Sequence, residues 1–242
     1  MIELRWRLLR RFAAAGLVAA SLAVARSSFA AETDASADSL RAALAAWQEG
    51  LQQVSTISSD FTQEKRLALF RDPLAIQGRL FLSTDGRFAW ETHSPVRYKL
   101  VVADGRIRQW DEESGRVQTI SMRDNPAAST IHSQMSVWFS GRFEELADTY
   151  SVELIAEQPV VFRFRPILGT PAADYLQAVE VQLHPDGHYL NHVRIFERSG
   201  DQTFISFVHT VLNPDLPDAT WDVRRIAEDR PAPDVVDPPS SE

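Results

Sequence analysis

From residue 57 onward the sequence alternates apolar and polar residues in short runs, and many of these runs are separated by turn dipeptides. The dipeptides are Asp or Ser followed by Gly, as in Asp85-Gly86 and Asp104-Gly105. Such pairs adopt the backbone conformations that tight hairpins require. The pattern therefore predicts a long antiparallel meander. We expect its strands at 57–70, 74–83, 87–93, 97–103, 106–111, 116–121, 150–157, 160–165, 175–183, 188–197 and 202–211.

The alternation also predicts which face of this sheet is buried, because successive side chains of a strand point to opposite faces. Leu80 and Leu82, for example, alternate with Arg79 and Ser83. One face should therefore be apolar and the other solvated. The residues expected on the solvated face include Arg79, Ser83, Arg87, Glu91, Arg97, Lys99, Glu180 and Gln182.

Two helical segments are expected to cover the apolar face. Residues 38–54 place apolar side chains at alternating steps of four and three, which forms one stripe of a helix that Asp38 or Ser39 could cap. Residues 129–150 lose the strand alternation and predict a short helical insert, followed by a second at 142–148. Because a one-faced sheet must be covered, we expect these two elements to close over it incompletely and to leave an apolar cavity.

The N-terminus has the layout of a secretory signal peptide. Several arginines precede an apolar run from Phe12 to Ala25, and Ser28-Phe29-Ala30 supplies small residues for cleavage. We expect residues 1–30 to be a signal peptide cleaved after Ala30, and residues 31–225 to form one carrier-like domain. The Pro-rich acidic segment 226–242 is expected to be a disordered tail.

Composition restricts the partners and the compartment. The formal charge is −8, and removal of five arginines and one glutamate with residues 1–30 leaves 20 basic and 32 acidic residues, a charge of −12. Such a protein repels nucleic acid. The chain has no cysteine, so it forms no disulfide and carries no lipid-modified cysteine anchor. These features predict a soluble periplasmic monomer.

Catalytic and metal-binding signals are weak. His184, His188 and His192 have helical spacing, but a Pro-Asp-Gly turn interrupts them, so we expect no metal site. Asp111 to Glu113 lie at an expected hairpin tip, and no Gly-x-Ser-x-Gly elbow or phosphate-binding glycine loop is present. The sequence therefore predicts a binding protein without a cofactor, and not an enzyme.

An ordered set of motifs resembles the LolA family of periplasmic lipoprotein carriers. The set comprises the N-terminal amphipathic helix, Ile57-Ser-Ser-Asp-Phe61-Thr-Gln63, Gly78-Arg-Leu80-Phe81-Leu, Phe88-Ala-Trp90, Pro95 and Val102-Ala-Asp104-Gly105. The resemblance is strongest over residues 38–121 and rests mainly on strand pattern over 150–211. It departs from the family at Thr84-Asp85, where typical carriers have an Arg-Pro pair whose arginine latches the helical lid.

The resemblance implies an unclosed antiparallel β-barrel, mostly β with some α, whose helices cover a cavity for acyl chains. It also implies an inner-membrane ATP-driven transporter that loads the carrier and an outer-membrane receptor that unloads it. A divergent client, such as a glycolipid or an acylated pigment precursor, is an alternative cargo. Together with the alternation, the resemblance predicts that the lipid-binding cavity is lined by Phe61, Leu80, Leu82, Phe88, Trp90, Leu100, Val102, Met135, Trp138 and Phe139.

Two other functions fit the same sequence. A periplasmic regulatory module of the same fold would bind a lipid or a peptide as a signal. A hydrolase with a dispersed site would instead show a polar pocket with convergent perturbed groups. The character of the pocket therefore discriminates the hydrolase from the two binding proteins.

Overall fold

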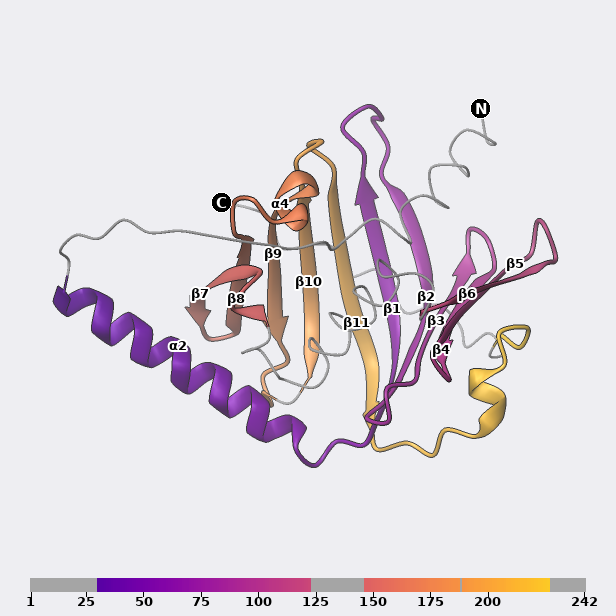
Figure 1. The fold of residues 1–242 in the computed structure, drawn as a ribbon, viewed down its shortest axis with the longest axis horizontal. Coiled ribbons are helices and arrows are strands. Elements are labelled where there is room, and N and C mark those ends of the chain that lie inside the picture. The colour runs from indigo at the N-terminus through magenta and orange to yellow at the C-terminus, as the bar shows by residue number, and fades with distance from the viewer. Residues whose placement is uncertain (1–29, 123–145, 188, 227–242) are drawn as a thin grey trace.

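The protein is built around one strongly curved antiparallel sheet of eleven strands (Figure 1). The computed structural model describes residues 30–122, 146–187 and 189–226. All eleven expected strands are present, which confirms the alternation as a guide to this fold. Their bounds are β1 Thr56–Arg66, β2 Leu74–Ser83, β3 Phe88–Ser94, β4 Tyr98–Ala103, β5 Arg106–Asp111, β6 Val117–Ser121, β7 Tyr150–Glu157, β8 Val160–Pro166, β9 Leu176–Leu183, β10 Leu190–Glu197 and β11 Gln202–Leu212.

The sheet consists of two meanders, and the expectation of a single meander is wrong. Strands β1 to β6 follow one another, as do β7 to β11, and the two halves join where β1 pairs with β11. This seam runs from the pair Ile57 and Leu212 to the pair Arg66 and Gln202. Strands β6 and β7 occupy opposite edges of the sheet. The result is the unclosed barrel-like sheet that the family resemblance implied.

Helix α2 spans Ala30–Leu51, so it begins earlier than the expected 38–54. Asp38 and Ser39 lie inside the helix, and the prediction that either residue caps it is wrong. The physical reason is that residues 30–38 contain no glycine or proline, so nothing in them stops the helix. Among the described residues, no helix is both long and apolar enough to cross a membrane.

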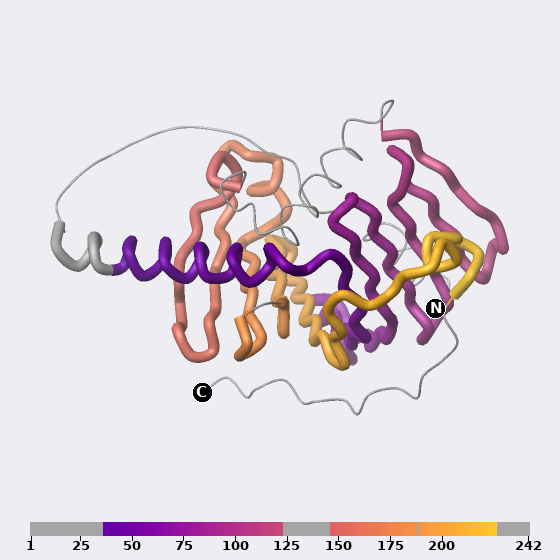
Figure 2. The backbone as a smooth tube through the Cα atoms, turned by 90° about the horizontal axis from the view of Figure 1, so that it is seen from below, coloured from indigo at the N-terminus to yellow at the C-terminus, as the bar shows by residue number. Residues whose placement is uncertain are grey.

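The inner, concave face of the sheet carries the main hydrophobic core. Its fully buried members include Trp47 from α2, Phe61 from β1 and Phe162 from β8. The Trp47 and Phe162 rings stack with centroids 5.5 Å apart, and this contact fastens α2 to the β7–β11 half of the sheet. Figure 2 shows α2 crossing the strands of that half. The predicted burial of the alternating apolar residues is therefore confirmed.

The outer face is not uniformly solvated, and the sequence expectation is wrong over β2 to β4. There the side chains of Phe81, Ala89 and Val101 form a second core with Trp221 and Val223. The last two come from the segment after β11, residues 213–226, which we call the strap. Its short helix η2, Asp218–Trp221, packs against β3 and β4. Alternation identifies the solvated face of a strand by its polar residues. Over β2 to β4 the outer face carries apolar residues as well, and the strap covers these together with charged ones, so polar residues do not mark a solvated face there.

Glu91 and Lys99 form an ion pair beneath the strap, although both were expected in solvent. Their side chains are 1% exposed each, and the Lys99 ammonium lies 2.6 Å from the Glu91 carboxylate. Lys99 also donates a hydrogen bond to the backbone carbonyl of Arg225. The pair therefore holds the strap against the sheet. Removing one partner of a buried pair is costly, because the other charge loses its compensation.

The expected helical insert at 129–148 lies mostly outside the described residues, as do residues 1–29 and the tail 227–242. The remaining small helix, α4, spans Pro171–Tyr175 and joins β8 to β9. Its first turn is capped by the Thr170 side chain, which accepts a hydrogen bond from the Ala173 backbone N–H.

We predict that Lys99→Met lowers the free energy of unfolding by about 3–5 kcal/mol, because Glu91 then loses its buried ammonium partner. Replacing both residues with apolar ones, Glu91→Leu with Lys99→Met, should restore most of this loss. Urea unfolding followed by circular dichroism measures the effect. Arg165→Met is the matched control, since its pairing with Glu153 is half exposed and is worth about 1 kcal/mol or less. Equal losses in Lys99→Met and Arg165→Met would contradict the role assigned to the buried pair.

Candidate functional site

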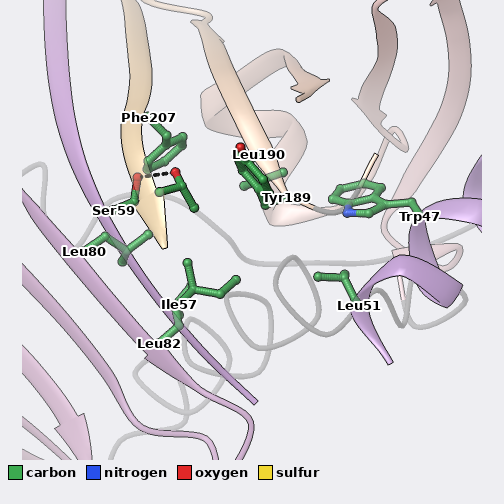
Figure 3. A pocket seen from close by; sticks show the side chains of 10 residues that line it. Trp47, Leu51, Ile57, Ser59, Leu80, Leu82, Tyr189, Leu190 and Phe207 are labelled. Carbon is green, nitrogen blue, oxygen red and sulfur yellow. Dashed lines mark hydrogen bonds between the residues drawn. The ribbon is translucent and has the colours of Figure 1, made fainter. Parts of the chain in front are cut away.

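A small apolar pocket lies where the C-terminal end of α2 meets the seam between β1 and β11 (Figure 3). Helix α2 contributes Trp47 and Leu51, and the sheet contributes the remaining walls. The β9–β10 turn adds Tyr189 next to Leu190. The lining residues are Trp47, Leu51, Ile57, Ser59, Leu80, Leu82, Tyr189, Leu190, Phe207 and Thr210. Both halves of the sheet and the covering helix therefore meet at this point.

Among the described residues that line the pocket, none carries a carboxylate, ammonium or guanidinium group. The one ionisable residue among them is Tyr189, whose pKa is raised by burial and by the nearby carboxylate of Asp186. Tyr189 is therefore neutral at physiological pH. Among the described residues, no group of three or more histidine or acidic side chains is placed to hold a metal ion. The site is suited to an uncharged, apolar ligand.

The volume of the pocket is about 20 Å³, enough for a single water molecule. A methylene group is about as large as a water molecule, so the pocket holds about one methylene and not the fourteen or so of an acyl chain. The described residues thus leave no room for an acyl chain in this pocket as they are arranged here.

The Ser59 and Thr210 hydroxyls both lie at the pocket, and that of Thr210 is there because of a β-bulge in the seam. The pairing register between β1 and β11 shifts between Ser58 and Asp60, and the extra residue opposite is His209, with a positive φ of 52°. Strict alternation would turn residues 209 and 211 inward after Phe207. The bulge instead brings Thr210 to the pocket, where its hydroxyl lies 2.7 Å from that of Ser59. The Ser59 hydroxyl also donates to the backbone carbonyl of Val208, so the pair is satisfied within the protein.

Next to the pocket, the Phe61 ring stacks on Trp90 with centroids 3.9 Å apart. The Phe61 ring lies directly over Gly78. A Cβ atom at residue 78 would come within 2.6 Å of this ring and 1.9 Å of the Glu91 carbonyl oxygen. Residue 78 must therefore be glycine for the aromatic pair to pack against the sheet.

The structure brings together seven of the residues that the sequence predicted for a cavity. They share the inner face and belong to the main core, but only Leu80 and Leu82 line the pocket itself. Met135, Trp138 and Phe139 lie outside the described residues. The other members of this inner-face group are Phe61, Phe88, Trp90, Leu100 and Val102.

Sequence reasoning missed most of the residues that line the pocket. Trp47 and Leu51 belong to the apolar stripe of residues 38–54, and Ile57 and Phe207 follow the strand alternation, so a pattern existed for them. Thr210 had none, because the bulge reverses the alternation before it. The pairing of β1 with β11, which places these residues around one space, also left no local signal.

The link between α2 and β1 is tied to the strap by one asparagine. Asn213 has a positive φ of 56°, and its side-chain oxygen accepts hydrogen bonds from the backbone N–H (2.7 Å) and the hydroxyl (3.0 Å) of Ser55. Its side-chain nitrogen donates to the carbonyl of Gln53, 3.0 Å away. The Thr84 backbone N–H donates to the carbonyl of Ser55. If α2 moves, it moves about a linker that these hydrogen bonds hold to Asn213 and Thr84.

The family model for the outer membrane lipoprotein carrier protein LolA matches residues 52–223, well over half of the chain. The chain belongs to the LolA family. A curated relative, the outer-membrane lipoprotein carrier protein of Chromohalobacter salexigens, is 24% identical over 168 residues, which cover 69% of this chain and 75% of the relative. The resemblance found in the sequence motifs is thereby confirmed.

Solved structures with a similar fold share little sequence with this LolA-family protein. A putative outer membrane lipoprotein-sorting protein domain from Vibrio parahaemolyticus aligns with a TM-score of 0.44 at 10% identity, covering 75% of this chain and 97% of that domain. A LolA superfamily protein from Nitrosomonas europaea aligns with a TM-score of 0.40 at 8% identity, covering 75% and 96%. MucB in its complex with MucA from Pseudomonas aeruginosa aligns with a TM-score of 0.43 at 14% identity, covering 73% of this chain and 58% of that one.

At Thr84-Asp85, where typical carriers have an Arg-Pro pair, this LolA-family protein makes a different set of contacts. Asp85 forms a 2.6 Å pair with Arg87 in the same turn. Burial alone would raise the Asp85 pKa, but hydrogen bonds from the Arg87 backbone N–H, the Ser83 hydroxyl and the Arg87 guanidinium outweigh it and lower that pKa. Arg87 also lies over the Trp221 ring, 4.7 Å from its centroid. The turn therefore holds the strap through Arg87 and the α2 linker through the Thr84 backbone.

We predict that Asn213→Gly speeds local opening of the α2 linker, because it removes the side-chain hydrogen bonds while leaving a residue that adopts positive φ readily. Hydrogen–deuterium exchange of residues 48–56 should increase, with little change in β7 to β9. Asn213→Ala separates the two causes, since it adds backbone strain of about 1 kcal/mol or more to the same loss. Unchanged exchange in Asn213→Gly would show that the asparagine does not restrain the linker.

Proposed function

We propose that this protein is a soluble periplasmic carrier that shields the acyl chains of a lipoprotein, or of another lipid-linked client, against the inner face of its sheet. An inner-membrane ATP-driven transporter would load it, and an outer-membrane receptor would unload it. It acts by binding and release, without catalysis and without a cofactor. Membership of the LolA family supports this role, and so does the uncharged apolar pocket beneath a helix.

The observation that carries the proposal is the way α2 covers the inner face. The helix buries few large residues there, chiefly Trp47 and Leu51, and stacks on the sheet through the Trp47–Phe162 contact. Exposing two such side chains costs on the order of 3–6 kcal/mol. Burying about fourteen methylenes of an acyl chain yields on the order of 10 kcal/mol. The exchange of α2 for an acyl chain therefore leaves about 4–7 kcal/mol to offset the entropy that the bound chain loses.

The same comparison of free energies explains why transfer of the acyl chain to a receptor would need no chemical step. The returning α2 recovers only part of the free energy that the departing chain loses. A receptor that offers the chain a comparable apolar site supplies the remainder, so release depends on a competing site. In this scheme the inner-face residues Phe61, Leu80, Leu82, Phe88, Trp90, Leu100 and Val102 become the walls of the opened cavity, joined by Met135, Trp138 and Phe139 of the insert.

We predict that Trp47→Ala tightens binding of a fluorescent long-chain fatty acid by at least about tenfold. The substitution lowers the cost of displacing α2, and the apparent affinity rises with the fraction of molecules that are open. Fluorescence titration of the purified protein, lacking residues 1–30, measures this change. Lipid extraction and mass spectrometry of protein isolated from periplasm identify the native client.

Trp221→Ala is the matched control. It removes a tryptophan that is also buried, but from the outer core under the strap, away from the pocket. It should destabilise the protein without changing fatty-acid affinity. The carrier proposal fails if the wild type and Trp47→Ala both bind no fatty acid and the isolated protein contains no lipid. Tighter binding in Trp221→Ala as well would show that general loosening, and not movement of α2, admits the chain.

A further inference from the structure

The inner face of the sheet carries a buried ion pair at the end away from the pocket. Lys65 of β1 and Glu197 of β10 have side chains that are 7% and 19% exposed, and the Lys65 ammonium lies 2.8 Å from the Glu197 carboxylate. Lys65 and the fully buried Phe61 stand an even number of residues apart in one strand, so both side chains point to the inner face. Directly beside Lys65 on that face are Leu74 of β2 and Thr203 of β11. Figure 1 shows this end of β1 opposite the end that α2 meets.

Lys65 differs from the other cations of the sheet in the face that it occupies. Among the strand residues that the structure describes, alternation places no other lysine or arginine on the inner face. Arg79, Lys99 and Arg163, for example, pair with carboxylates on the outer face. A buried ion pair adds little net stability to an apolar surface, because both ions lose their hydration. Stability alone therefore gives little reason for a cation here, whereas a surface that holds a lipid has a direct use for one.

The distance from the pocket to Lys65 suits an acyl chain. Ser59 lines the pocket, and Lys65 follows six residues later on the same face of β1. A strand rises about 3.3 Å per residue, so the two residues are roughly 20 Å apart along β1. The hydrocarbon core of a bilayer is about 30 Å thick, so an acyl chain in one leaflet spans roughly 15 Å. A chain whose methyl end lies at the pocket therefore brings its polar head within reach of the Lys65 ammonium.

We propose that Lys65 binds the anionic head group of the lipid client, a carboxylate or a phosphate, while the acyl chain lies along the inner face. This inference rests on the proposed carrier function and narrows its client to an anionic lipid. In the structure Glu197 occupies the position of the head group, just as α2 covers the position of the chain. When the client binds, its head replaces the Glu197 carboxylate at the ammonium. Glu197, the more exposed partner, then turns into water, where its charge is hydrated.

The buried Thr203 strengthens this assignment. It lies directly opposite Lys65 on β11, and its side chain is on the inner face beside the ammonium. A hydroxyl group can donate a hydrogen bond to the same anion that the ammonium attracts. Hydrogen bonds from a charged donor are also stronger than neutral ones. The head group is therefore expected to be recognised at this end of the inner face, and the apolar end of the chain at the pocket.

Displacement of a fluorescent long-chain alcohol from the purified protein, lacking residues 1–30, tests this proposal. The unlabelled competitors are palmitate, palmitoyl lysophosphatidate and hexadecanol, which share one chain length and differ in the head group. We expect the wild type to bind at least one of the two anionic lipids about tenfold or more tightly than hexadecanol, because only an anion makes a charge-assisted hydrogen bond to Lys65. The order of the two anions shows whether a carboxylate or a phosphate is preferred.

The double variant Lys65→Met, Glu197→Gln removes both charges, so that neither group is left buried without its partner. It should keep the wild-type affinity for hexadecanol and bind all three lipids with similar affinity. The variant Glu197→Gln alone removes the competing carboxylate and should strengthen binding of the preferred anion about threefold or more. The matched control is Arg163→Met, Glu180→Gln, which removes a cross-strand pair of 2.6 Å from the outer face and should keep the preference.

The outcomes separate this inference from the carrier function. Equal affinity of the wild type for all three lipids overturns the head-group assignment and leaves the carrier function in place. A preference for anions that persists in Lys65→Met, Glu197→Gln also overturns it, because another group then recognises the head. If none of the lipids, hexadecanol included, displaces the probe, the carrier function fails and this inference fails with it.

Discussion

The pairing of β1 with β11 is the interaction on which the rest of the structure depends. It joins strands about 150 residues apart, as the hydrogen bond between the Ser59 and Thr210 hydroxyls illustrates. Without it the two meanders would be separate curved sheets, each with an apolar face and no partner. With it they form one concave surface whose central strands are β1 and β11. The pocket, the bulge at His209 and the Asn213 contacts all lie along this seam.

The seam also couples α2, which covers the inner face of the sheet, to the strap, which covers part of the outer face. The chain leaves α2 and enters β1 at the point where it leaves β11 and enters the strap, and Asn213 ties these two connections together. The strap is fixed to the outer face by the second core and by Lys99, so the α2 linker has a rigid base. By contrast, α2 stacks on the inner face through Trp47. A firmly fixed outer cover and a lightly held inner one suit a protein that opens on only one side.

The packing along the inner face shows how the fold reconciles a core with a binding surface. Phe61, Gly78 and Trp90 form a close-packed unit that depends on the missing side chain at residue 78. Near α2 the packing ends in a small pocket with uncharged walls. The same residues therefore serve as core when α2 is in place and would serve as lipid contacts after it moves. Such double use explains why an apolar face that is nearly filled is compatible with a carrier.

The sequence by itself determined the strands, the inner face and the family, because period-two alternation, turn dipeptides and an ordered set of motifs are local signals. It determined the helical stripe with Trp47 and Leu51, though not where the helix begins. Only the tertiary structure decided that β1 pairs with β11, that Thr210 faces the pocket, and that Glu91 and Lys99 are buried beneath the strap. The physical reason is that strand partners, bulges and covers depend on contacts between residues far apart in the chain. No local pattern specifies such contacts.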